Sequence, residues 1–176
     1  MPALLCLCEV QDRRVAEDLI EEVGWDSKLV YAEDPTERID GADVVLLYAK
    51  GHFSADGPTR SHNVHNRFAT RDILEVPLRT HSGDELLVLC NHWPSRMYPR
   101  SDPLRIGLAD FCWRLFADRV RYSKETLFTK EGKPKLPSRK SLEARWRQRV
   151  LLMGDFNDSP FDASIEEVLG ATRDRE

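Results

Sequence analysis

The residues best suited to catalysis lie where apolar segments of the sequence end. Asp155 and Asn157 follow the apolar run 150–153, from which Gly154 separates them. A carboxylate and a carboxamide two residues apart can together hold a water molecule, a hard cation and a phosphate oxygen. Gly, Asp, Asn and Pro are also the usual residues of turns, so an ordinary strand-to-loop turn is the alternative interpretation.

Two other apolar segments end in comparable residues. Residues 3–8 are followed by Glu9, and a second apolar segment leads to His92. Taken singly, such a Glu is commonly a solvated strand-edge residue, and such a His is commonly a structural hydrogen-bonding group. Taken with the Asp155 turn, they provide an acid for a hard cation, an imidazole and an Asp/Asn pair. Hydrolysis of a phosphate ester requires these groups.

A layered arrangement of strands and helices must bring these residues together. The run 150–153 has no polar break, which predicts a strand buried on both faces. Asp12 and Gly24 are typical residues for the two ends of a helix that lies between them. The hydrophobic pattern predicts further strands at 3–8, 28–31, 43–48, 68–78 and 85–90, and helices at 104–121, 141–147 and after Asp162 or Ser164. Strands that alternate with helices, with a hairpin turn at 82–84, fit an α/β protein with a mixed sheet.

Length and composition fit a single ordinary globular domain. The chain has 176 residues, of which 32% are charged and 41% hydrophobic, and it contains no run near the ~18 apolar residues of a membrane span. Its first residues lack the basic start of an export signal. The four cysteines lie in apolar runs, which favours buried, reduced thiols over a metal site. We therefore expect a cytoplasmic protein, unless a longer N-terminus carries an export signal.

Positive charge is concentrated in one segment. Residues 119–149 contain eleven Lys/Arg and three Glu, so this segment carries +8 in a chain whose net charge is −4. A basic segment on an acidic body can lie along a polyanion, and Trp146 could stack on an unpaired base, which makes nucleic acid a candidate partner. Gly132 and its neighbouring prolines favour the alternative, a solvated basic insertion or mobile loop at 121–148.

Three histidines lie in a second polar segment, residues 51–66. They are His52, His62 and His65, and their flanking residues are mainly Ser, Asn and Gly. Metal ligation by this cluster is one interpretation. The polar surroundings favour the other, a solvent-exposed loop without a metal.

Three motifs resemble, in order and spacing, those of the endonuclease/exonuclease/phosphatase superfamily, which includes pancreatic-type deoxyribonuclease and apurinic/apyrimidinic endonucleases. The motifs are Leu7-Cys8-Glu9-Val10, Asn91-His92-Trp93-Pro94-Ser95-Arg96 and Gly154-Asp155-Phe156-Asn157-Asp158, with softer matches at 41–48 and 70–74. The resemblance implies a four-layer α/β sandwich with two packed mixed sheets. It also implies hydrolysis of phosphate esters with a divalent cation, Mg²⁺ or Mn²⁺.

The resemblance implies roles for individual residues at the catalytic centre. Glu9 matches a metal-binding glutamate. Asp155 matches an aspartate that orients or deprotonates the attacking water or assists the leaving group, and it is expected near the metal. Asn157 matches a side chain that binds the phosphate, and His92 matches a histidine that donates to it. Asp43 is expected to brace His92 through a hydrogen bond.

Substrate contacts are implied for three further positions. Arg71 matches an arginine placed for a substrate phosphate, a task that suits a guanidinium group. Asn91 and Ser95 flank His92 in the second motif and are predicted to bind substrate.

The sequence also departs from the family pattern. A first strand that ends in Asn near the metal has no counterpart, and neither has a C-terminal Ser-Asp-His stretch. We therefore expect residues 1–176 to form one domain of this type that is truncated at both ends. The alternative to an active phosphoesterase is a catalytically impaired domain that binds phosphate or a partner.

Overall fold

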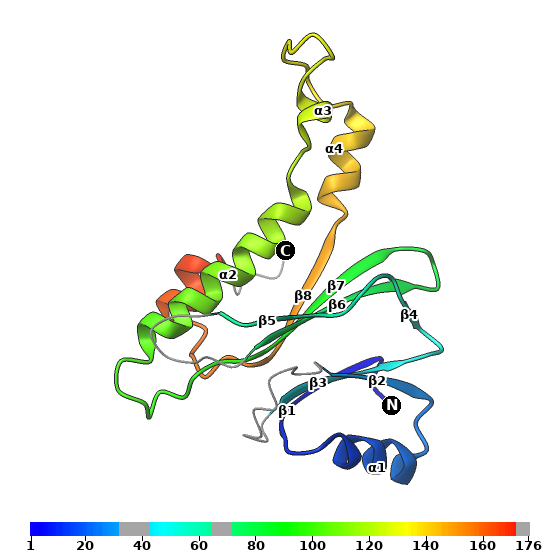
Figure 1. Cartoon of the computed structure of the whole chain (residues 1–176), viewed down its shortest axis with the longest axis vertical. Helices are drawn as coiled ribbons and strands as arrows, with labels where there is room; N and C mark the ends of the chain where they lie inside the picture. The colour runs from blue at the N-terminus through cyan, green and yellow to red at the C-terminus, as the bar shows by residue number, and fades with distance from the viewer. Residues whose placement is uncertain (32–42, 65–71, 172–176) are drawn as a thin grey trace.

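The computed structural model describes residues 1–31, 43–64 and 72–171, and it contains two packed sheets flanked by helices (Figure 1). The strands are β1 Leu4–Val10, β2 Ser27–Tyr31, β3 Asp43–Ala49, β4 Phe53–Ala55, β5 Arg60–His62, β6 Ile73–Thr80, β7 Glu85–His92 and β8 Arg149–Asp155. The helices are α1 Arg13–Val23, α2 Asp102–Val120, α3 Lys124–Leu127, α4 Arg139–Trp146 and the π-helical turn η1 Ser164–Val168.

The layers follow the order helix, sheet, sheet, helix (Figure 1). The first sheet has the strand order β1-β3-β2 under α1, and the second has the order β4-β6-β7-β8, with β5 also paired to β6, under α2 and η1. β7 and β8 are parallel and the other described pairs are antiparallel. The predicted four-layer α/β sandwich is therefore confirmed, although only the second sheet is mixed among the described strands.

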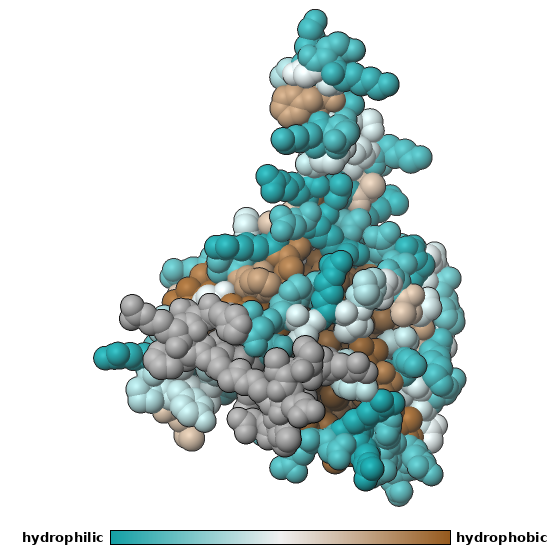
Figure 2. Space-filling view, viewed as in Figure 1, coloured by the Kyte–Doolittle hydropathy of each residue, from teal (hydrophilic) through white to brown (hydrophobic). Residues whose placement is uncertain are grey.

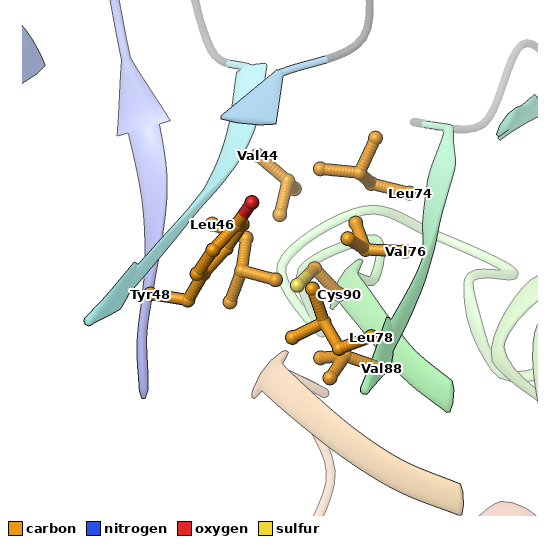
Figure 3. Close-up of a cluster of buried hydrophobic side chains, with 8 residues drawn as sticks. All are labelled: Val44, Leu46, Tyr48, Leu74, Val76, Leu78, Val88 and Cys90. Atoms are coloured by element: carbon orange, nitrogen blue, oxygen red, sulfur yellow. The ribbon is translucent and has the colours of Figure 1, made fainter. Parts of the chain in front are cut away.

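The main core lies between the two sheets (Figure 3). Alternate residues of each strand point to the same face, so every second side chain of β3, β6 and β7 enters this layer. The buried members are Val44, Leu46, Tyr48, Leu74, Val76, Leu78, Val88 and Cys90. Alternation also explains the outer layers, because the opposite faces of β3 and β7 pack against α1 and α2.

Local signals fix the ends of the early elements as predicted. The Oδ1 atom of Asp12 accepts a hydrogen bond from the backbone N–H of Arg14 (3.0 Å) at the start of α1, and Gly24 ends this helix with a φ of 59°. Gly83, with a φ of 88°, lies in the tight turn that joins β6 to β7. The predicted hairpin is confirmed.

Strand β8 differs from its prediction. Its apolar run predicted burial on both faces, but Leu151 and both ends of the strand are exposed. Val150 and Leu152 pack toward α2, whereas Leu151 points to the other face. The physical reason is the cover on that face: Met153 packs against the core between the sheets, whereas Leu151, two residues earlier on the same face, is 38% exposed.

The polar segment 51–66 also differs from its prediction as a loop. It contains β4 and β5, two strands of three residues that pair with β6. His62 lies on β5 and is partly buried, with its Nε2 atom 2.5 Å from Oε2 of Glu75 and its ring tilted against Phe111. The exposed-loop interpretation is therefore wrong for His62, and His65 lies outside the described residues.

Residues 121–148 form a projection that we call the arm (Figure 1). It leaves the end of α2, passes through α3 and a tight turn, and returns through α4 to β8. The predicted helix at 141–147 is confirmed as α4, which begins two residues earlier, after Ser138. No residue of the arm whose burial is described is buried. Among the described helices, none is both long and apolar enough to span a membrane.

Candidate active site

The candidate site lies where the carboxyl ends of β1, β7 and β8 meet. His92 and Asp155 are partners in the parallel ladder of β7 and β8, which places them side by side. Glu9 comes from the other sheet, and its Oε1 atom lies 3.8 Å from Nε2 of His92. The fold therefore brings together three residues that are more than 60 positions apart in the sequence.

The two members of the Glu9–His92 pair differ in their exposure to solvent. The His92 side chain is only 5% exposed, whereas the Glu9 side chain is 70% exposed. Glu9 has a φ of 62°, an uncommon conformation for a residue with a Cβ, which changes the direction of the chain near the end of β1. A buried imidazole beside a solvent-facing carboxylate can donate to an anion, and Glu9 remains accessible to a cation.

Gly154 is required by the close approach of β8 to β7. Its φ is 127°, and a Cβ atom added there would lie 1.8 Å from the backbone oxygen of Asn91. No side chain can occupy that space. The glycine of the motif therefore lets the Asp155 turn approach the end of β7.

The turn after β8 fixes the orientation of Asp155. The Oδ1 atom of Asp155 accepts a hydrogen bond from the backbone N–H of Asn157 (2.8 Å). Asn157 has a φ of 49°, and its Nδ2 donates to the backbone oxygen of Trp93 (2.8 Å). The backbone N–H of Trp93 in turn donates to the backbone oxygen of Asp155 (2.8 Å). These bonds join the loops that follow β7 and β8 into one unit.

A buried ion pair supports this unit from α2. Nε of Arg105 lies 2.6 Å from Oδ1 of Asp158, and the two side chains are 3% and 4% exposed. Nη1 of Arg105 also donates to the backbone oxygen of Pro94 (3.1 Å) and to Oγ of Ser101 (2.8 Å). One guanidinium group thus contacts both loops of the site and the start of α2.

Sequence reasoning missed Arg105 and Asp158. A signal for Arg105 exists, because it lies three and four positions before Leu108 and Ala109, on the buried side of α2. An arginine on the buried side of a helix needs an anionic or carbonyl partner. The sequence does not identify Asp158 as that partner, since the two residues are 53 positions apart.

Asn91 and Ser95 lie in different surroundings. The Asn91 side chain is fully buried, where Nδ2 donates to the backbone oxygen of Leu89 (2.8 Å). Its Oδ1 accepts from Nε1 of Trp93 (3.1 Å) and from the thiol of Cys112 (3.2 Å). Asn91 therefore has no exposed atom for a substrate and instead braces the end of β7. Ser95 is half-buried, and its Oγ accepts from the backbone N–H of Met97 (3.3 Å).

Two of the predicted residues, Asp43 and Arg71, are described in part or not at all. The backbone of Asp43 pairs with Val10 at the start of β3, and Glu9 precedes Val10 in the irregular part of β1 between Leu7 and Val10. Arg71 lies outside the described residues.

The residues present fit one kind of metal site and not another. Within the described ranges, no group of three His, Cys, Asp or Glu side chains could hold an ion, which argues against a zinc cage. Mg²⁺ differs, because one or two carboxylates suffice when water and substrate oxygens complete its shell. Glu9 and Asp155 are exposed carboxylates at the site and fit that requirement.

The nearby cysteines are poor ligands and nucleophiles at neutral pH. A hydrogen bond with Cys6, together with burial, raises the pKa of the Cys8 thiol far above its ordinary value. Burial raises the pKa of the Cys112 thiol to about 12. The four thiols are free, and protonated thiols neither bind metal nor attack phosphorus effectively.

Comparison with solved structures identifies the fold independently. The catalytic domain of human nocturnin with bound sulfate matches with a TM-score of 0.65 at 12% identity, over 94% of this chain and 55% of that chain. D. rerio TDP2 complexed with single strand DNA product matches with a TM-score of 0.59 at 14% identity, over 95% and 52%. ANGEL2, a 2′,3′-cyclic phosphatase, in complex with adenosine-2′,3′-vanadate matches with a TM-score of 0.58 at 15% identity, over 93% and 42%.

The chain therefore spans about half the length of these structures. No curated protein matches it in sequence. The family model described as the endonuclease/exonuclease/phosphatase family matches residues 1–127, which include the Glu9 and His92 motifs. The match covers more than half of the chain, and the four-layer fold agrees with it. The protein belongs to the endonuclease/exonuclease/phosphatase family.

Proposed function

We propose that the protein hydrolyses phosphate esters with the help of a divalent cation, Mg²⁺ or Mn²⁺. The observation that carries this proposal is the meeting of three strand ends, with Glu9 3.8 Å from His92 and Asp155 beside His92 in the ladder. Membership of the family supports it, and so do the structural neighbours, of which one is a phosphatase and another contains a DNA product.

His92 acts on the phosphate in this proposal. As imidazolium it donates a hydrogen bond to a phosphate oxygen and offsets the charge that develops on the pentacovalent phosphorus. Its low exposure strengthens that interaction, since few waters compete for the same charge. His92 then supplies the proton that the departing oxygen requires as the P–O bond breaks.

Asp155 acts on the water. Its carboxylate, held through Oδ1 by the backbone N–H of Asn157, accepts a proton as the water oxygen bonds to phosphorus. Asn157 also contributes a side chain near the phosphate. The proton accepted by Asp155 and the proton donated by His92 balance the reaction.

The cation would be held by Glu9 and Asp155. When bound, it supplies positive charge to the phosphate oxygens and lowers the pKa of a coordinated water. Arg71 is proposed to contact a second substrate oxygen. Asp43 is proposed to brace His92, and Ser95 to contact the substrate beside it.

Hydrolysis of bis-p-nitrophenyl phosphate by the purified chain with Mg²⁺ tests this function. Glu9→Gln and Asp155→Asn should each lower the rate at least about 100-fold, because each removes a carboxylate from the reacting centre. Glu22→Gln, an exposed carboxylate on α1, is the matched control and should retain the wild-type rate. Full activity in the two site variants would contradict the assignment.

One observation favours a second candidate, a domain that binds phosphate without hydrolysing it. Among the described residues, the site offers fewer than three metal-ligating side chains within reach of one ion. Calorimetry with Mg²⁺ and a nucleoside monophosphate separates the two candidates. Binding without turnover of any phosphate ester would favour the second.

A further inference from the structure

The arm carries a dense positive charge that the candidate active site does not use. Residues 121–148 contain nine Lys/Arg and three Glu. The arm projects from the body, and its surface is mainly hydrophilic, with a small apolar area (Figure 2). Phe128 and Leu136 are exposed there, beside the charged side chains. The other residues of the chain are acidic in sum, so a polyanion is attracted to the arm more than to the body.

The arm has an ordered backbone that presents these charges. Its tip is closed by hydrogen bonds from the backbone N–H of Thr129 to the oxygen of Lys133 and from that of Lys135 to the oxygen of Leu127, each 2.8 Å long. At its base, Nη1 of Arg145 donates to the backbone oxygen of Arg119 (2.6 Å), which ties α4 to α2. A preorganised display of charge binds with a smaller loss of conformational entropy than a mobile loop.

A hollow at the base of the arm is a second surface feature, distinct from the charged side chains. It has a volume of about 410 Å³ and is lined by Trp113, Arg114, Ala117, Asp118 and Arg121. Trp113 and Arg121 are two helical turns apart, so they share one side of the chain as α2 leads into the arm. Trp113 is 48% exposed, although it is a large aromatic residue on a helix that otherwise packs on a sheet.

An exposed tryptophan with arginines beside it is suited to unpaired bases. Every base has a flat π-face that can stack on an indole ring, and arginine adds a cation for the adjoining phosphate. Arg114 is already 2.6 Å from Asp110, and Arg121 is 3.9 Å from Asp118. Both ion pairs are exposed and therefore weak, so phosphates can compete for these arginines.

The hollow and the arm lie toward the opposite end of β8 from the candidate site. β8 runs from Arg149, next to the arm, to Asp155, and its seven residues span about 20 Å. A strand stacked at the duplex spacing of about 3.4 Å per nucleotide covers this distance in about six steps, and a more extended strand covers it in fewer. A strand of about 20 nucleotides is therefore long enough to reach both places.

We infer that the hollow and the arm bind single-stranded nucleic acid, with one base on Trp113 and the backbone along the lysines of the arm. The inference rests on the proposed function, which supplies the cleavage of a phosphate ester. It adds that the substrate is a nucleic acid strand. An acidic protein is the other polyanion to consider. The tryptophan in the hollow favours the nucleic acid, because every nucleotide joins a phosphate to a flat base that can stack on the indole, whereas the carboxylates of an acidic protein have no such ring.

Fluorescence anisotropy with a labelled single strand of about 20 nucleotides tests this inference, at about 50 mM salt and with EDTA to prevent hydrolysis. Replacing Lys130, Lys133 and Lys135 together by Gln should weaken binding at least about tenfold. It should also lower the salt slope by about 2, since each lost phosphate contact removes about 0.7. Trp113→Ala should weaken binding at least about fivefold, and Trp113→Phe should restore most of it.

The lysine substitutions in the arm and the substitution of Trp113 each have a matched control. Replacing Arg14 of α1, Lys28 of β2 and Lys50 after β3 by Gln removes three exposed charges from the first sheet and its helix. Phe116→Ala removes an exposed aromatic ring of α2 outside the hollow. Both should bind the strand as the wild type does. Equal affinity of the arm variant and its control would overturn the inference, as would an absence of binding by the wild type.

Three further outcomes separate this inference from its alternatives. Tighter binding of a duplex than of a single strand would overturn the single-strand assignment. Strand binding through the arm without hydrolysis of any ester would contradict the proposed function alone. Hydrolysis of the small ester, with strand binding that does not depend on the arm, would contradict this inference alone.

Discussion

The loops that follow β7 and β8 and the arm between α2 and β8 are both rich in charge, but they use it in opposite ways. At the loops, Arg105 of α2 and Asp158 are almost completely buried and form an ion pair. In the arm, the charged side chains are exposed and mostly of one sign. Buried charge of both signs fixes a geometry, whereas exposed charge of one sign remains available to a partner.

The loops and the arm belong to one crossover, the connection from β7 to β8. The chain leaves β7 through the His92 loop, runs along α2 and the arm, and returns through β8 to Asp155. Arg105 near the start of α2 contacts both loops of the candidate site, and the arm beyond the end of α2 contacts the body little (Figure 1). If the comparison is correct, substitutions in the loops should affect stability strongly and substitutions in the arm should not.

The largest expected effect comes from breaking the buried ion pair. Arg105→Ala should lower the free energy of unfolding by up to about 3–5 kcal/mol, because the buried Asp158 carboxylate would keep only the exposed Arg96, 3.4 Å away, and the Ser164 hydroxyl as partners. Urea denaturation measures this change. Arg114→Ala is the matched control on the same helix, since its ion pair with Asp110 is exposed and should contribute less than about 1 kcal/mol.

A double substitution sharpens this test. Replacing Arg105 by Met and Asp158 by Leu together removes both charges, so the double variant should be less destabilised than either single variant. Equal losses for Arg105→Ala and Arg114→Ala would show that the buried pair does not hold the loops, and would remove the contrast between the loops and the arm.

Most of the fold was accessible from the sequence because its signals are local. Alternating apolar residues, the Asp12 cap and the Gly83 turn each specify structure within a few positions. The family motifs also marked Glu9, His92 and Asp155, which the structure brings together, although their chemical roles remain predictions. β4 and β5 were missed because three residues are too few for a periodic pattern.

The missed features depend on tertiary neighbours. The apolar run of β8 predicted burial, but burial of both faces requires a layer packed on each face, which this run does not encode. His62 resembled a loop residue until Glu75 and Phe111 were placed beside it. Asn91 was predicted to bind substrate from its place in a motif, yet its side chain faces Trp93 and Cys112 in the core.

An intermediate effect is expected from alkaline pH at the core beneath the loops of the candidate site. Burial raises the pKa of the Cys112 thiol from 9.0 to about 12. A group whose pKa is higher in the folded state stabilises the protein below its unfolded value and loses this contribution as the pH rises through the folded value. The free energy of unfolding should therefore fall between about pH 9 and 12, by up to about 1.4 kcal/mol per pH unit for this thiol.

Urea denaturation at several pH values checks the thiol prediction. Cys112→Ala should be less stable than the wild type near neutral pH but should lose less stability between about pH 9 and 12. The difference between the two curves isolates the thiol from lysines and tyrosines, which titrate in both proteins. Parallel curves would contradict the prediction.

The smallest effect on stability is expected in the arm. Replacing Lys133 and Lys135 by Gln removes two exposed charges from the tip, where the backbone hydrogen bonds do not involve their side chains. The free energy of unfolding should change by no more than about 0.5 kcal/mol. A slight increase in the free energy of unfolding is the expected direction, because like charges in the arm repel one another. A loss above about 1 kcal/mol would show that these lysines hold the arm in place, and the distinction between a positioning region and a binding region would then fail at the arm itself.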